Sequence, residues 1–108
     1  ANIDRISYSQ LEKVGLQRRA RDRIGTFSRG QLQRLSWARA LLHAPRLLLL
    51  DEPETGLDQE GRALIETLWQ EHTSKGGYSI YTTHRPEQEL KAGDRIVHLS
   101  NGRVVTRL

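Results

Sequence analysis

The chain has 108 residues, of which 36% are hydrophobic and 28% are charged, a composition that suits one small domain or a piece of a larger one. A membrane-spanning helix needs roughly 20 predominantly apolar residues. The longest apolar run here is Leu47–Leu50, so we expect neither a transmembrane helix nor a signal peptide. The absence of cysteine excludes disulfides and thiolate metal sites, which fits a cytoplasmic protein.

The net charge is +4, and 14 of the 17 basic residues are arginine, a side chain that favours bidentate pairing with carboxylates and phosphates. Four of these arginines lie within residues 17–23: Arg18, Arg19, Arg21 and Arg23. Two interpretations of this cluster stay open. It is either a solvated basic surface or a contact site for an anionic partner.

The first half of the chain predicts two helices and a strand. Ser7–Leu16 allows a short helix that stops at Gly15. Ser28 has the character of an N-cap for a helix that continues to about His43. The run Leu47–Leu50 shows no polar alternation, which is typical of a strand covered on both faces. We therefore expect a central parallel strand there.

The second half continues this alternation of helix and strand. Residues Gln59–Ser74 predict an amphipathic helix that is closed by Gly76-Gly77. Tyr78–Thr83 is aromatic, β-branched and apolar enough for a second strand. Pro86 then favours the start of a short helix that ends near Gly93.

The last segment predicts a β-hairpin. Asp94–Leu99 and Arg103–Thr106 flank Asn101-Gly102, a pair that supplies the two positive φ angles of a type I′ turn. The order of elements is therefore that of an α/β fold with a parallel sheet, helices and a C-terminal antiparallel hairpin.

Chemically useful side chains follow the predicted strands. Asp51 and Glu52 come directly after the apolar run, and His84 ends the next strand. Carboxylates at a strand end suit a hard cation such as Mg²⁺ and a water molecule that must be oriented. An ordinary loop start or helix cap would also explain the two acids, and a structural role would explain a lone histidine.

The predicted helix after Ser28 begins with Arg29, Gly30 and Gln31. The first N–H groups of a helix have no partner within it, so this start suits a phosphate near the Ser28 hydroxyl and the Gly30 backbone. An ordinary capped helix is the alternative, because any Ser-x-x-Gln sequence satisfies the capping pattern.

These motifs together resemble the ATPase subunits of ABC transporters. The resemblance rests on the order of Phe27–Gln31, Leu47–Pro53, Gly56–Asp58 and His84, and it covers most of the chain between the first and the last of them. It implies a partial P-loop NTPase-type fold. Residues 1–43 would be a portion of the helical subdomain with the signature helix, and residues 44–108 would run from the Walker B strand to the closing strands.

The resemblance also implies a role for each motif. The signature residues, which would bind the γ-phosphate of ATP held by the opposite subunit, are Ser28, Arg29, Gly30 and Gln31. Asp51 would support Mg²⁺ through water, Glu52 would act as the general base, and His84 would sense the γ-phosphate. The loop that would cross the dimer interface is Gly56, Leu57 and Asp58.

Three departures from the family pattern stand out. The phosphate-binding loop G-x-x-x-x-G-K-[ST] occurs nowhere, and none of the lysines follows a glycine. Arg29 stands where the family more often has glycine, and Glu54 stands where a small hydroxyl residue is frequent. We therefore expect a chain that begins inside the helical subdomain and that does not hydrolyse ATP alone.

For the complete subunit, the resemblance implies an ATPase that couples ATP hydrolysis to transport. Its expected partners are a second ATPase subunit and transmembrane permease subunits, with no direct nucleic-acid partner, at the cytoplasmic face of the cell membrane. The transported substrate and the direction stay open, although the motifs are also similar to those of exporter subunits, haem exporters included. Two alternatives remain: a chromosome-maintenance or DNA-repair ATPase of ABC type, and a non-enzymatic basic interaction module.

Overall fold

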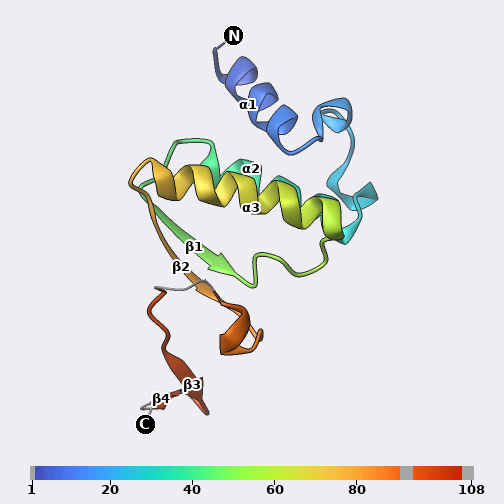
Figure 1. The fold of residues 1–108 in the computed structure, drawn as a ribbon. Coiled ribbons are helices and arrows are strands. Elements are labelled where there is room, and N and C mark those ends of the chain that lie inside the picture. The colour runs from blue at the N-terminus through green and yellow to red at the C-terminus, as the bar shows by residue number, and fades with distance from the viewer. Residues whose placement is uncertain (1, 91–93, 106–108) are drawn as a thin grey trace.

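The computed structural model describes residues 2–90 and 94–105 (Figure 1). The α-helices are α1 (Asn2–Lys13), α2 (Arg29–Leu41) and α3 (Gln59–Ser74). The strands are β1 (Leu47–Asp51), β2 (Tyr78–Thr82), β3 (His98–Ser100) and β4 (Arg103–Val105). Single turns of 3₁₀ helix lie at Gln17–Arg19, Ile24–Thr26 and Glu87–Glu89. This is the α/β fold with a C-terminal hairpin that the sequence predicts.

β1 and β2 form a parallel pair, and α3 makes the crossover between them. The register pairs Leu47 with Tyr78 and Asp51 with Thr82. Because parallel strands of equal length in this register end together, the loops after Asp51 and Thr82 leave the sheet at the same edge. That edge is the carboxyl edge of the sheet.

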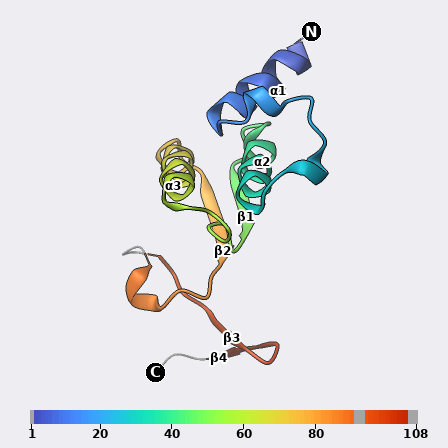
Figure 2. The same cartoon turned by 90° about the vertical axis from the view of Figure 1, so that its right-hand side faces the viewer.

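A hydrophobic core joins α2 and α3 to one face of the sheet (Figure 2). Trp37 of α2 lies against Trp69 of α3, with ring centroids 5.6 Å apart, and Trp69 meets Tyr81 of β2 edge to face at 4.8 Å. Edge-to-face and tilted arrangements are those that aromatic quadrupoles favour. The buried apolar residues are Val14, Leu16, Trp37, Ala38, Leu48, Leu57, Ile65, Leu68 and Trp69.

The other face of the sheet is open in the structure. Leu48 is 2% exposed, whereas Leu47 and Leu49 are 49% and 72% exposed. On β2, Tyr78 and Ile80 are similarly exposed. The expectation of a central strand covered on both faces is therefore wrong for the described part of the chain, in which β1 pairs with β2 alone and both packing helices lie on one side.

The helix boundaries follow local sequence signals. Ser28 is the N-cap of α2, as predicted, and α3 has the predicted bounds. α1 begins earlier than expected, at Asn2, and the positive φ of Gly15 (73°) redirects the chain just after it. The short helix expected after Pro86 is a single 3₁₀ turn, and its expected end at Gly93 falls outside the described residues.

The hairpin forms as predicted but with shorter strands. β3 and β4 pair antiparallel, and Asn101 and Gly102 have φ angles of 52° and 75°, as a type I′ turn requires. Thr106, expected in the second strand, lies outside the described residues. Within the described ranges, no helix has the length and apolar character needed to cross a membrane.

Candidate functional site

The carboxyl edge of the sheet brings together the acids and the histidine singled out in the sequence. His84 Nε2 lies 2.8 Å from Glu52 Oε1. The side chain of His84 is 93% exposed and that of Glu52 is 35% exposed, so the pair sits at the surface, where small molecules reach it. The predicted proximity of Glu52 and His84 is thus present in the structure, although they are 32 residues apart in the chain.

Thr82 connects Asp51 to the neighbouring Glu52. The Thr82 hydroxyl donates to Asp51 Oδ1 at 2.5 Å and accepts from the Glu52 backbone N–H at 3.0 Å. Glu52 has a positive φ of 46°, an uncommon conformation for a residue with a side chain. The hydrogen bond from its N–H to Thr82 helps to hold this conformation. The sequence showed Thr82 only as a strand residue.

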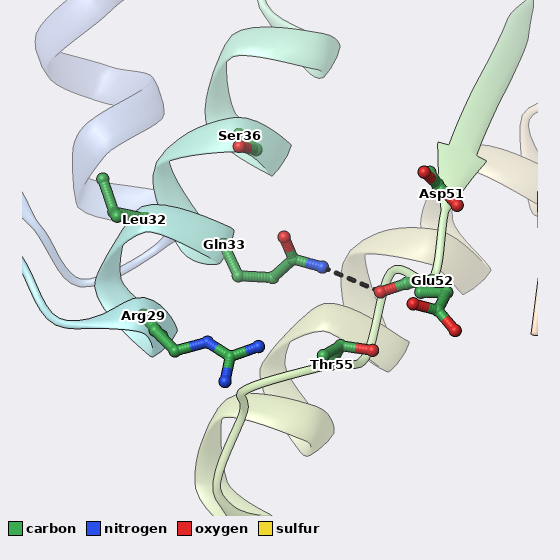
Figure 3. A pocket seen from close by; sticks show the side chains of 7 residues that line it. All are labelled: Arg29, Leu32, Gln33, Ser36, Asp51, Glu52 and Thr55. Carbon is green, nitrogen blue, oxygen red and sulfur yellow. Dashed lines mark hydrogen bonds between the residues drawn. The ribbon is translucent and has the colours of Figure 1, made fainter.

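α2 fixes the loop that follows Glu52. Gln33 Nε2 donates to the Glu52 carbonyl oxygen at 3.2 Å (Figure 3). It also donates to the Pro53 carbonyl oxygen at 2.6 Å. The indole N–H of Trp37 points to the same Pro53 oxygen at 3.5 Å. Sequence reasoning missed Gln33, because its partners lie about twenty residues away and no motif marks it.

A cavity of about 290 Å³ lies between the start of α2 and the end of β1 (Figure 3). Its lining combines one guanidinium, two carboxylates, an amide and two hydroxyls with a single leucine: Arg29, Leu32, Gln33, Ser36, Asp51, Glu52 and Thr55. No group of three or more potential metal ligands occurs among residues 2–90 and 94–105. One or two carboxylates are, however, the usual protein contribution to Mg²⁺, so the Asp51 carboxylate at the end of β1 fits that ion.

The start of α2 is a complete capping box. Ser28 Oγ accepts from the Gln31 backbone N–H at 3.1 Å, and Gln31 Oε1 accepts from the Ser28 N–H at 3.0 Å. Arg19 donates to the same Gln31 oxygen at 2.6 Å, and its guanidinium lies 4.5 Å from the centre of the Phe27 ring. The Ser28 and Gln31 side chains therefore act as they would in an ordinary capped helix. The backbone N–H groups of the first turn have no acceptor within the helix itself.

Arg19 also forms an ion pair with Asp22 at 3.0 Å. It donates in addition to the Thr26 hydroxyl at 2.8 Å. The guanidinium of Arg19 thus links the two 3₁₀ turns that precede α2 to the start of that helix. This engagement favours a structural role for Arg19 over contact with an anionic partner.

The loop Gly56–Asp58 packs against the start of α2. A Cβ atom at Gly30 would lie 3.2 Å from the Gly56 carbonyl oxygen, so only a glycine fits there without displacement. Leu57 is buried in the core at 8% exposure. Asp58 caps α3 by accepting from the Gly61 N–H at 2.7 Å, and its side chain is 75% exposed. Of the three residues expected at a dimer interface, Gly56 and Asp58 are therefore on the surface.

Comparison with known proteins decides the family. The model of the ABC transporter family matches residues 2–55, half of the chain. The chain belongs to the ABC transporter ATP-binding family. The aliphatic sulfonates import ATP-binding protein SsuB 1 of Burkholderia cenocepacia is 46% identical over 98 residues, which cover 87% of this chain and 30% of that protein. SsuB 2 of Pseudomonas fluorescens is 44% identical and is covered to 35%. The chain thus spans about a third of the length of these relatives.

Solved structures of ABC transporters share the fold. The ADP conformation of an ATP-binding cassette superposes with a TM-score of 0.66 at 24% identity, over 81% of this chain and 34% of the cassette. An inward-facing ABC transporter assigned to the metal-chelate type gives a TM-score of 0.64 at 29% identity, over 78% of this chain and 34% of its own. The resemblance and the fold class predicted from the sequence are confirmed. The relatives named above are import proteins, so the likeness to exporter subunits gains no support from them.

Proposed function

We propose that this chain supplies the signature helix, the Walker B acids and the switch histidine of an ATP-hydrolysing ABC import subunit. The observation that carries the proposal is the contact between Glu52 and His84 beside Asp51, at one edge of the parallel sheet. A carboxylate and an imidazole in hydrogen-bond contact can orient a water molecule and take up its proton. The family membership makes ATP the corresponding substrate.

In this proposal Glu52 is the general base. Its carboxylate accepts a hydrogen bond from His84 Nε2–H and keeps its second oxygen available for the attacking water. Asp51, fixed by Thr82, would hold Mg²⁺ through water, and His84 would face the γ-phosphate. When bound, Mg²⁺ supplies charge neutralisation on the phosphates.

The start of α2 is proposed to bind the γ-phosphate of ATP held by a second ATPase subunit. The Gln31 N–H is engaged by Ser28 Oγ, but the N–H groups before it in the first helical turn have no acceptor within the helix, and together with the partial positive charge of the helix start they favour an anion there. Arg29 adds a full positive charge in an exposed first-turn position. Gly56 and Asp58 would contact the partner, and permease subunits at the cytoplasmic face of the membrane would complete the assembly.

The relatives give a substrate class to this proposal. Because they are named as import proteins for aliphatic sulfonates, we infer that the assembly imports small organic anions of this kind. Recognition of the anion would belong to the permease or to a binding protein. The ATPase subunit would supply only the energy of ATP binding and hydrolysis.

The test is a chimera in which this chain replaces the corresponding segment of SsuB 1 from B. cenocepacia. The chimera is expected to hydrolyse ATP in a Mg²⁺-dependent way. Glu52→Gln keeps the size of the side chain but removes the base, so turnover should fall about 10²-fold while ATP binding persists. Glu71→Gln, on the exposed surface of α3, is the matched control and should retain turnover. Wild-type turnover in Glu52→Gln would reassign the base.

The role of α2 toward the second subunit needs a variant that spares the helix cap. Arg29→Glu reverses the first-turn charge without touching the Ser28–Gln31 capping box. In the chimera, ATP binding by the monomer should be unchanged and turnover of the dimer should fall. A weaker ATP affinity of the monomer would show that the helix serves the site of its own chain.

A further inference from the structure

A second contact joins the same two loops as the Glu52–His84 pair. Arg85 Nη1 lies 2.8 Å from Glu54 Oε2, and the two residues are 31 positions apart. Glu54 follows β1 by three residues and Arg85 follows β2 by three residues. The ion pair therefore joins the loop after β1 to the loop after β2. It lies C-terminal to the Glu52–His84 contact on both loops.

The Glu54 side chain is only 23% exposed and that of Arg85 is 46% exposed. A partly buried pair is screened less by salt and water than a fully exposed one. Arg85 is further held within its own loop: its backbone N–H donates to Thr83 Oγ1 at 3.0 Å, and its Nε lies 3.4 Å from Glu89 Oε2. Arg85 is thus a fixed point of that loop.

His84, in contrast, has little packing of its own. Its side chain is 93% exposed, so its position depends on the contact with Glu52 and on the path of the backbone on either side. On one side the chain continues through Thr83 directly into β2, which ends at Thr82, and on the other side Arg85 is anchored through Glu54. Releasing Arg85 would leave the histidine held from one side only.

We propose that Glu54 and Arg85 are positioning residues that hold His84 against Glu52. The catalytic side of this inference rests on the proposed function, because Glu52 and His84 matter to turnover only if the subunit hydrolyses ATP. The structural side concerns this chain alone. Glu54 and Arg85 do not touch the reacting groups themselves but set the distance between the two loops that carry them.

The first experiment tests the structural side in the full 108-residue chain. The imidazole ¹⁵N signals of His84 are measured at one fixed pH and assigned by their loss in His84→Gln. Glu52→Gln defines the signal of a released imidazole. Glu54→Gln and Arg85→Gln should each move the His84 signals toward that reference, and the double variant should move them no further than either single one.

Glu89 offers the matched control, because it contacts Arg85 within one loop without bridging the two loops. Glu89→Gln should leave the His84 signals in place. A charge swap of Glu54→Arg with Arg85→Glu, built on Glu89→Gln so that two acids do not face each other, should restore them. If Glu54 and Arg85 acted only by local packing, exchanging their charges would not return the His84 signals to their wild-type positions.

The second experiment measures turnover in the chimera with SsuB 1. Arg85→Gln and Glu54→Gln should lower kcat about threefold to fivefold, the range that a weak ion pair can supply, with KM for ATP unchanged. The charge swap should recover kcat relative to Glu89→Gln alone.

The two experiments separate the two proposals. His84 signals that stay at their wild-type positions in Arg85→Gln would overturn the positioning role, whatever the chimera does. Displaced signals with unchanged kcat would overturn its catalytic consequence. An unmutated chimera that fails to hydrolyse ATP would instead overturn the proposed function, while the signals in the 108-residue chain would still decide the positioning.

Discussion

The two faces of the β1–β2 sheet are built from the same kinds of residue but have opposite environments. Leu48 faces the helices and is 2% exposed, while its neighbour Leu49 is 72% exposed. On β2, Tyr81 packs against Trp69, whereas Tyr78 is 68% exposed. Burial here is decided by which elements pack on the sheet, and not by the hydrophobicity of the strand itself.

This difference also explains where the candidate site lies. The covered face is held by α2 and α3, and side chains of α2 reach from it to the carboxyl edge, where Gln33 and Trp37 contact the Pro53 oxygen. The edge is therefore positioned by the packed side of the sheet. An open apolar face is, by contrast, typical of a surface that contacts other protein.

The sharpest test of the comparison is a pair of identical substitutions on adjacent residues. Leu48→Ala removes a buried side chain and leaves a cavity, so it should lower the free energy of unfolding by about 3 kcal/mol. Leu49→Ala removes an exposed side chain and should change it by less than about 0.5 kcal/mol. Urea denaturation of both variants measures the two values. Equal losses would mean that the open face is covered in solution, for example by a second copy of the chain.

The second prediction concerns the point where the covering helix α3 meets the starts of both strands. His72 Nε2 lies 2.9 Å from the Pro45 carbonyl oxygen, and a Cβ atom at Gly77 would overlap the His72 ring atoms Cε1, Nδ1 and Nε2. Gly77→Ala must therefore displace the imidazole and break this hydrogen bond. We expect a loss of about 2 kcal/mol in the free energy of unfolding.

Gly25→Ala is the control for Gly77→Ala, because a Cβ atom at Gly25 has nothing within 4 Å. It should change the stability by less than about 0.5 kcal/mol. If Gly77→Ala were as mild as Gly25→Ala, the imidazole would not be packed as closely as the structure shows, and α3 would be joined to the strands by its apolar contacts alone.

Much of the fold and the outline of the site could be predicted from the sequence because both depend on local signals. Ser28 caps α2 through residues of its own first turn, and the ends of neighbouring parallel strands necessarily meet at one edge, which brings Glu52 to His84. The exposure of Leu49 could not be predicted, because a run of four leucines contains no alternation that distinguishes the faces. The partners of Gln33 and Arg85 were missed for a related reason: they are distant in the chain, and polar surface residues carry no periodic pattern.

The smallest expected effect distinguishes the two tyrosines of β2. Burial, followed by the hydrogen bond that its hydroxyl donates to Asp94 Oδ2 at 2.8 Å and the negative charge of that carboxylate, raises the pKa of Tyr81 to about 12. The unfolded phenol ionises near pH 10, whereas the folded one stays neutral up to about pH 12. The stabilising contribution of Tyr81 is therefore complete below pH 10 and is lost as the pH rises toward 12.

Titration of phenolate absorbance measures this effect directly. Asp94→Asn removes the negative charge beside the hydroxyl, so the Tyr81 midpoint should move down while the part caused by burial remains. Tyr78→Phe, on the open face, should leave the Tyr81 midpoint where it is, because the two side chains point to opposite faces of the strand. If Asp94→Asn left the Tyr81 midpoint unchanged, burial against Trp69 alone would account for the raised pKa. The packing of the covered face, and not the loop that carries Asp94, would then set the ionisation of Tyr81.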